Sequence, residues 1–244
     1  MDKSDYRQHI SSQFNAELED VRSRVLEMGG RVETQILDAT RALVSLDGIL
    51  ASQVEAADQA INRIEVRIDE DCSQILVRRQ PTAGDLRLVY AVIKTITDLE
   101  RIGDEAAKIA RMAISLAAKE RTREHMLQVQ HLSNQVRTMV HDALDAFARM
   151  DAEAAVAVAR QDIVVDREYE SLMRQLMTYM MEDVRTVGPV IDIIFCIRAM
   201  ERIGDHAKNI AEYVVYLVKG KDVRHIGIDA MERQVLARPP DPAE

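Results

Sequence analysis

The sequence is poor in the residues that interrupt helices or build β-sheets. It has no Trp, an aromatic content of 4%, 9 Gly and only 5 Pro among 244 residues. Three of the prolines lie in the last six residues, so the rest of the chain contains almost no strong helix breakers. Because Ala, Leu, Met, Glu, Arg and Gln are plentiful and favour helices, the composition predicts long helices and argues against a β-sandwich or β-barrel.

Cysteines and long apolar stretches are also scarce. The two cysteines, Cys72 and Cys196, form no Cys-x-x-Cys pair, which favours a reducing compartment. The strongest apolar run, residues 190–197, contains Asp192 and is far shorter than the ~18 residues of a membrane-spanning helix. The N-terminal stretch lacks the apolar segment of a secretory signal. We therefore expect a cytoplasmic protein without membrane insertion.

Positive charge is in short supply. The 32 Lys and Arg are outnumbered by 41 Asp and Glu, which gives a net charge of −9. This balance argues against nucleic acid as a partner, although it leaves room for local cation sites.

A repeated motif dominates what is present. The five residues Glu-Arg-Ile-Gly-Asp occupy positions 100–104 and recur at 201–205. A second register relates residues 41–47 to 145–151, with an offset of 104, and the same offset relates Asp58 to Asp162. The sequence therefore predicts a tandem duplication of about 100 residues, with about three helices in each copy.

The apolar residues recur every three or four positions, as they do along one face of a helix. We therefore predict an all-α fold of two tandem three-helix bundles related by internal duplication. The bundles should span residues 6–119 and 122–220, followed by a C-terminal tail, 221–244, whose last eight residues we expect to be disordered. The predicted helices are 6–46, 50–79, 82–118, 123–149, 152–182 and 189–219.

Each copy of the motif places two acids four residues apart, with a glycine between them. On a helix these acids share a face and repel each other, and the glycine costs about 1 kcal/mol of helix stability relative to Ala. Because residues that weaken a helix recur at the same positions in both copies, we infer that they have a role beyond helix formation. The residues are Glu100, Gly103 and Asp104 in the first copy and Glu201, Gly204 and Asp205 in the second.

The preceding helix supplies further oxygen ligands. Asp162 and Asp166 are four residues apart, and their counterparts in the first copy are Asp58 and Asn62. If the second and third helices of each bundle face one another, each copy assembles three or four oxygen ligands. Such a site suits iron, manganese, magnesium or calcium better than a soft metal.

Three alternatives remain open from the residues. Asp104 with Lys108, and Asp205 with Lys208, could form ordinary surface ion pairs. The chain could be a carboxylate-bridged metalloprotein for metal storage or catalysis, although such bundles usually add a Glu-x-x-His pair that the two copies do not share. It could also be a helical adaptor without metal. No nucleophile–base pairing or phosphate-binding loop is recognisable, so we predict no enzymatic activity.

Two segments resemble the signature regions of the PhoU proteins, the accessory proteins of phosphate-specific transport systems. They are "RRQPTAGDLRLVYAVIKTITDLERIGDEAAKIA" and "AMERIGDHAKNIAEYVVYLVKGKDVRH", and the resemblance covers nearly the whole chain. It implies two three-helix bundles that bind metal clusters, often iron or zinc, with magnesium or manganese still possible. It also implies negative regulation of phosphate uptake and of the phosphate-starvation response, through a phosphate ABC transporter and a PhoR-type sensor histidine kinase. Members of the family often form homodimers.

The resemblance also implies the metal ligands of this chain. Asn62 stands where the family usually has an aspartate, so we expect weaker metal binding at the first site. The implied ligands are Glu100, Asp104, Glu201 and Asp205, with Asp58, Asp162 and Asp166 from the preceding helices.

Overall fold

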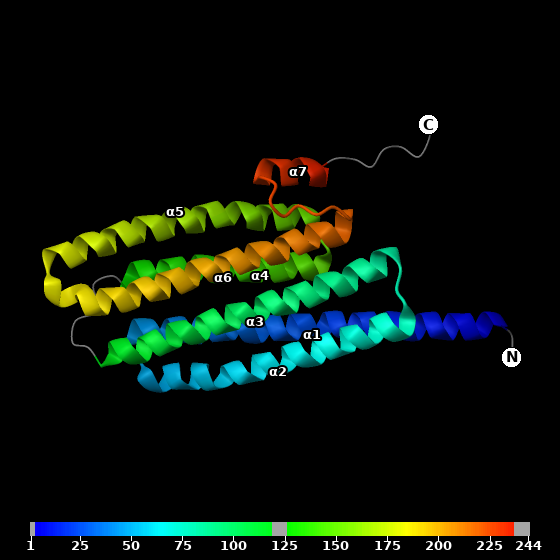
Figure 1. Cartoon of the computed structure of the whole chain (residues 1–244), viewed down its shortest axis with the longest axis horizontal. Coiled ribbons are helices and arrows are strands. Elements are labelled where there is room, and N and C mark those ends of the chain that lie inside the picture. Colours follow the sequence, from blue (N-terminus) through cyan, green and yellow to red (C-terminus); the bar gives the residue numbers. More distant parts are fainter. Residues whose placement is uncertain (1–2, 119–125, 237–244) are drawn as a thin grey trace.

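The computed structural model describes residues 3–118 and 126–236, with side chains from residue 13 onward, and this part of the chain contains helices and no strand (Figure 1). This confirms the predicted all-α fold. The elements are α1 (Lys3–Ser45), α2 (Gly48–Arg79), α3 (Ala83–Ala117), α4 (Met126–Arg149), α5 (Ala152–Glu182), the short 3₁₀ helix η1 (Val184–Thr186), α6 (Val187–Lys219) and α7 (Ile228–Leu236).

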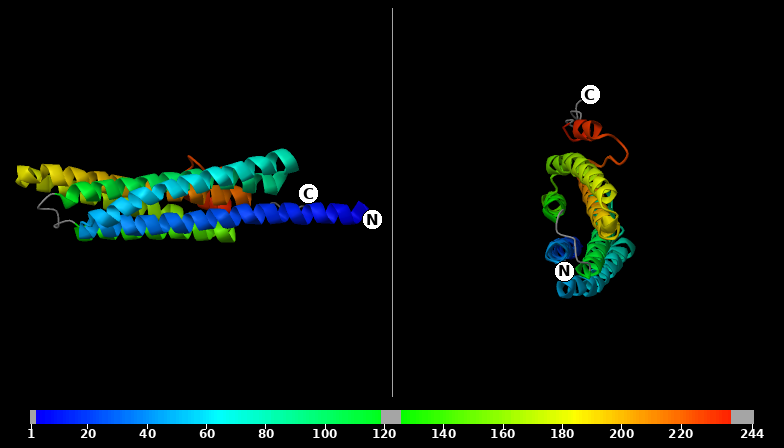
Figure 2. Two further views of the ribbon diagram at one scale, coloured as in Figure 1. Left: turned by 90° about the horizontal axis from the view of Figure 1, so that it is seen from below. Right: turned by 90° about the vertical axis from the view of Figure 1, so that its left-hand side faces the viewer.

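The long helices form two groups that pack along a shared seam. Helices α1, α2 and α3 contact one another, as do α4, α5 and α6. Helices α3 and α6 lie side by side and make the most extensive contact between the two groups, with a smaller contact between α1 and α4 (Figures 1 and 2). The buried apolar side chains form one continuous cluster, so the two halves share a core.

The internal duplication is visible in the packing. Buried positions in α1 recur 104 residues later in α4, and those in α2 recur in α5 with the same offset. The same register therefore places the same faces of the helices in the core. Equivalent buried pairs include Val25 and Val129, Met28 and Leu132, Ala51 and Ala155, Ile68 and Leu172, and Cys72 and Leu176.

The duplication extends to the turns between the first and second helix of each copy. Leu46 and Met150 both adopt a positive φ, of 58° and 52°. Each is followed by an aspartate, Asp47 or Asp151, whose side chain accepts hydrogen bonds of 3.0 Å from two backbone N–H groups of the next helix. These aspartates satisfy N–H groups that the first turn of a helix leaves without a partner.

The C-terminal segment contains a helix that the sequence did not lead us to expect. Gly220 ends α6 in the left-handed conformation, and after a short connection α7 packs on α5. Met231 and Val235 are buried there, and Arg160 of α5 pairs with Glu232 at 2.5 Å. The last eight residues, expected to be disordered, and residues 123–125, expected to begin the fourth helix, lie outside the described residues.

No helix in the described segments is long and apolar enough to cross a membrane.

Candidate functional site

The structure brings the predicted acids of the first copy together at the contact between α2 and α3. Burial raises the pKa of Glu100, and the neighbouring charges of Asp104, Glu65 and Asp58 raise it further. Burial also raises the pKa of Asp104, again with Asp58 as the next cause. Each ionised carboxylate makes ionisation of the neighbouring carboxylates less favourable, because their charges have the same sign. We call Asp58, Asn62, Glu65, Glu100 and Asp104 the first acidic site.

Glu65 is a member of this site that sequence reasoning missed. Its pKa is raised by burial, by Asp69 and by Asp104. Glu65 lies seven residues after Asp58, and therefore on the same face of α2. The equivalent position in the second copy holds Tyr169, so comparison of the two repeats gave no reason to select it. The helical spacing alone was the signal that could have found it.

The predicted acids of the second copy meet in the same way between α5 and α6. Burial followed by the charge of Asp162 raises the pKa of Asp205. Burial followed by Asp205 raises the pKa of Glu201. The pKa of Asp166 is raised by burial and then by Asp162 and Asp205. We call Asp162, Asp166, Glu201 and Asp205 the second acidic site.

The two motif glycines differ in how closely other side chains approach them. A Cβ atom on Gly103 would lie 3.1 Å from Gln35 Oε1 and 3.3 Å from Asp58 Oδ1. On Gly204 it would lie 3.4 Å from Val165 Cγ1. Because Gly103 has no side chain, α3 can pack closely against the acid-bearing face of α2. This accounts for the place of the glycine between the two motif acids.

The two sites differ in the cations bonded to them. In the second site, Lys208 donates to Asp162 at 2.6 Å and Arg198 donates to Glu201 at 2.8 Å. The equivalent positions in the first copy, 101 residues earlier, hold Ala107 and Thr97. Among the described residues no Lys, Arg or His forms an ion pair with an acid of the first site. Asp58 instead accepts a 3.0 Å hydrogen bond from the Gln35 amide.

The surface ion pairs that we considered as an alternative do not form as expected. Lys108 bonds to Glu105, at 3.2 Å, rather than to Asp104. Lys208 bonds to Asp162 on the neighbouring helix rather than to Asp205. The motif aspartates are therefore not explained as partners of these lysines.

Both acidic sites contain a buried oxygen that has no hydrogen-bond partner. These atoms are Asn62 Oδ1 in the first site and Glu201 Oε2 in the second. An unsatisfied buried acceptor costs about 1–3 kcal/mol, which a bound cation offsets. In the described side-chain positions no three His, Cys, Asp or Glu groups are close enough to hold a metal ion. The donor set is nevertheless all oxygen and suits a hard cation.

A buried polar network beside the motifs joins the two halves. His206 Nδ1 lies 2.6 Å from Asp98 Oδ1, which also accepts a 3.2 Å hydrogen bond from Asn209. At the equivalent position in the first copy, Glu105 pairs with Arg202 of α6 at 3.0 Å. The residue after each motif aspartate thus reaches across the α3–α6 seam. Sequence reasoning missed this network because its members are about 100 residues apart.

Comparison with known proteins agrees with this architecture. The family model described as the PhoU domain matches the chain twice, over residues 25–113 and 129–214. The chain belongs to the PhoU family. It is 54% identical, over 96% of its length and 97% of the relative, to the phosphate-specific transport system accessory protein PhoU homolog of Pseudomonas aeruginosa. It is 48% identical to the phosphate-specific transport system accessory protein PhoU of Escherichia coli, over 99% of this chain and all of that protein.

Solved PhoU structures have the same fold. The crystal structure of PhoU from Pseudomonas aeruginosa superimposes with a TM-score of 0.83 at 55% identity, covering 85% of this chain and 100% of that one. The phosphate transport system regulatory protein PhoU from Streptococcus pneumoniae gives a TM-score of 0.80 at 28% identity, covering 86% and 99%. These PhoU proteins are named as accessory or regulatory proteins and not as enzymes, in agreement with our prediction for this chain.

Proposed function

We propose that this PhoU-family protein is a negative regulator of phosphate uptake and of the phosphate-starvation response. In this role it couples a phosphate ABC transporter to a PhoR-type sensor histidine kinase. The observation that carries the proposal is similarity over nearly the full length to proteins named as accessory proteins of phosphate-specific transport systems. The long exposed helix faces suit the docking of partner helices, which requires no catalytic group.

We propose further that each repeat binds metal through its acidic site. In this proposal the repeats, residues 6–119 and 122–220, carry one site each, and the segment 221–244 lies outside both. The metal is iron or zinc, with magnesium or manganese compatible with the oxygen donors. When bound, it neutralises acids that otherwise repel one another. The ligands are Asp58, Glu100 and Asp104, with Asn62 and Glu65 added, and Asp162, Asp166, Glu201 and Asp205.

The cellular setting that we propose is the cytoplasm, with the protein acting as a homodimer and without nucleic acid as a partner. Free, buried thiols support a reducing compartment: Cys72 and Cys196 are both unpaired, and burial raises the pKa of Cys72 to about 12. A thiol that stays protonated in an apolar core is chemically inert.

Deletion of the gene in phosphate-fed cells tests the regulatory role. We expect expression of phosphate-starvation genes to rise in high phosphate and to return to its normal level when the full chain is restored. A pull-down from the same cells should recover the transporter and the kinase. Unchanged expression in a strain that has no second PhoU protein would contradict the proposal.

Metal analysis separates this proposal from its rivals. The adaptor alternative predicts protein without metal after purification in the absence of chelator. The metalloenzyme alternative predicts redox or hydrolytic turnover by the metal-loaded protein, whereas a regulator shows none.

A further inference from the structure

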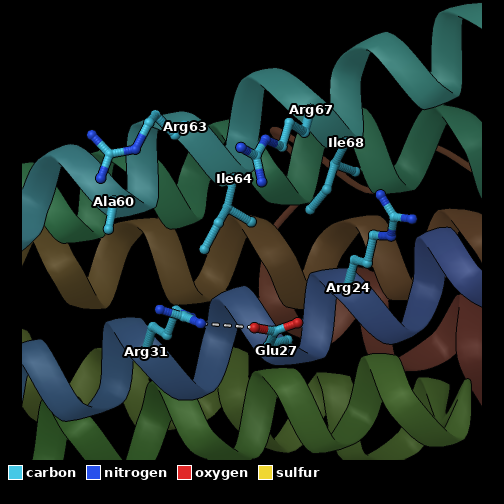
Figure 3. A pocket seen from close by; sticks show the side chains of 8 residues that line it. All are labelled: Arg24, Glu27, Arg31, Ala60, Arg63, Ile64, Arg67 and Ile68. Atoms are coloured by element: carbon cyan, nitrogen blue, oxygen red, sulfur yellow. Dashed lines mark hydrogen bonds and ion pairs between the residues drawn. The ribbon is translucent and has the colours of Figure 1, made fainter.

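Arginine side chains gather in a groove on the surface of the first bundle. The groove runs between α1 and α2 and encloses about 480 Å³. Figure 3 shows Arg63 and Arg67 on α2 and Arg24 and Arg31 on α1, with Ile64 and Ile68 between the helices. Among the described residues that line the groove, Glu27 is the one acid. In a chain of net charge −9, four guanidinium groups around one small cavity are a marked local reversal of charge.

Two of these guanidinium groups are available to a ligand. Among the described residues no hydrogen bond or ion pair is formed by Arg63 or Arg67, and both are exposed. Arg24 pairs with Asp20 and Asp71 at 2.8 Å, and Arg31 pairs with Glu27 at 2.9 Å. These pairs are exposed to solvent and contribute little, so an incoming anion can compete for them.

The dimensions of the groove select a short anion with several charges. Arg24 and Arg31 are seven residues apart, which is about 10 Å along a helix. A single phosphate contacts guanidinium groups at both ends only when these side chains bend towards one another, whereas two or three linked phosphoryl groups contact them along the groove. Guanidinium groups bind phosphoryl oxygens in pairs, which makes arginine well suited to such ligands.

Two further cavities lie between the same helices. Towards the C-terminal end of α2, one is lined by Glu17, Asp20 and Asp71 together with Arg78, and these acids pair with Arg79 and Arg24. In the other direction the groove adjoins a cavity of about 450 Å³ lined in part by Leu50 and Val54. That neighbouring cavity has room for an apolar group attached to the phosphates, such as a nucleotide base.

The second repeat provides an internal comparison. A cavity of about 310 Å³ lies between α4 and α5, and with the offset of 104 its lining corresponds to that of the 450 Å³ cavity rather than to that of the arginine groove. With the offset of 104, Arg24, Arg31 and Arg67 correspond to Gln128, Gln135 and Ser171, and Arg63 alone corresponds to an arginine, Arg167. Three of the four arginines that line the groove are therefore specific to the first repeat.

We propose that the α1–α2 groove is a binding site for a short oligophosphate, either free or as the phosphate chain of a nucleotide. This site is separate from the acidic sites and does not depend on the proposed regulatory role. Arg63 and Arg67 contact the phosphoryl groups from α2, and Arg24 and Arg31 contact them from α1.

Calorimetric titration of the full chain with tripolyphosphate, ATP and orthophosphate tests the proposal. The buffer has low salt and contains a chelator, so that no metal at the acidic sites can bridge to the anion. We expect tripolyphosphate and ATP to bind, and orthophosphate to bind at least about tenfold more weakly because it reaches fewer arginines. Affinity should fall as salt is added. Tighter binding of ATP than of tripolyphosphate would identify a nucleotide as the ligand, and equal affinity would identify the phosphate chain alone.

Matched variants locate the binding. Arg63→Gln with Arg67→Gln should weaken tripolyphosphate binding by at least about tenfold. Arg167→Gln with Arg174→Gln makes the same change of charge on the exposed face of α5 and should change affinity by less than about twofold. Arg67→Lys keeps the charge but not the paired donors, so it should bind more weakly than the unaltered chain. Thermal melts establish that each variant folds.

Three results would overturn the proposal. One is the absence of binding by tripolyphosphate and ATP at low salt. Another is an equal loss of affinity in the groove variant and the α5 control, which would indicate a general charge effect. The third is tighter binding of an acidic peptide than of any phosphate compound, which would make the groove a peptide-docking surface.

Discussion

The two acidic sites have the same number of acids but different surroundings. The first holds Asp58, Glu65, Glu100 and Asp104 and has no bonded cation among the described residues, whereas the second holds four acids with two bonded cations, Lys208 and Arg198. From the sequence we expected the first site to bind metal more weakly, because Asn62 replaces an aspartate. In the structure Glu65 supplies the fourth acid, and the first site has cations nearby, Arg101, Arg111 and Lys108, but none bonded to its acids among the described residues. A comparison of the two repeats position by position is therefore a poor guide to the charge of each site, because it passes over Glu65 and does not show which acids have a bonded cation.

Removal of the motif acids should have the largest effect. We expect Glu100→Gln with Asp104→Asn to abolish metal binding at the first site, and to remove more metal at limiting concentration than Glu201→Gln with Asp205→Asn. The reason is that a cation at the second site must compete with Lys208 and Arg198. Elemental analysis and metal titration of chelator-treated protein measure the metal content of both double variants. Metal content that survives both pairs of substitutions would contradict the assignment of the ligands.

The α3–α6 seam should respond unequally to substitutions at equivalent positions. His206→Ala leaves Asp98 buried with the Asn209 amide and the Tyr213 hydroxyl as partners, and we expect a loss of about 3 kcal/mol in the free energy of unfolding. Glu105→Ala leaves Arg202 and Lys108, which are partly exposed and return to water, so the expected change is below about 1 kcal/mol. Chemical denaturation measures both, and equal effects would show that burial of Asp98 is not the deciding factor.

Lys208→Met should make the second site resemble the first. With Asp162 free of its ammonium partner, we expect metal affinity at the second site to rise about tenfold, while the metal-free protein becomes less stable because the acids repel one another. Competition with a chromogenic chelator measures the affinity. Lys108→Met is the matched control, since Lys108 bonds to Glu105 outside the first site. Unchanged affinity in Lys208→Met would show that the lysine does not compete with metal.

The smallest effect concerns pH. Burial raises the pKa of Glu212 to about 7, with Lys208 and Arg224 acting in the opposite direction. Because the folded state holds this proton more tightly than the unfolded state, Glu212 lowers stability as pH rises from about 4.5 through about 7.

Glu212→Gln should remove this loss. We expect its advantage over the unaltered chain to be about 1 kcal/mol at pH 8 and to vanish at pH 4, after allowance for solvent screening. Thermal melts across this range measure the difference. Glu182→Gln makes the same substitution at an exposed carboxylate at the end of α5 and should leave the pH profile unchanged between these values. A parallel shift of both variants would contradict the assignment to Glu212.

Much of the fold was predictable because its signals are local and repeated. The helix boundaries agree with the predicted ones to within three residues wherever the structure describes them. Apolar spacing identifies helix faces, and the turn aspartates Asp47 and Asp151 follow from simple capping rules. The acid pairs were visible because a helix places residues four apart on one face.

Other features depended on contacts between distant residues. The Asp98–His206 pair joins residues 108 positions apart, and α7 is a nine-residue helix stabilised by its packing on α5. The Arg-lined groove required α1 and α2 to be set side by side before Arg24 and Arg67 could share a cavity.

The sequence by itself determined the helices, their duplication and the positions of the seven predicted acids, because each of these depends on spacing along the chain. The tertiary structure decided how charge is balanced around them. Whether a carboxylate faces Lys208, the Gln35 amide or another carboxylate depends on which helices pack together and, in the first repeat, on how closely Gly103 lets α3 approach α2. Electrostatic energies depend on distance through space and on burial, and neither is a property of the linear order of residues.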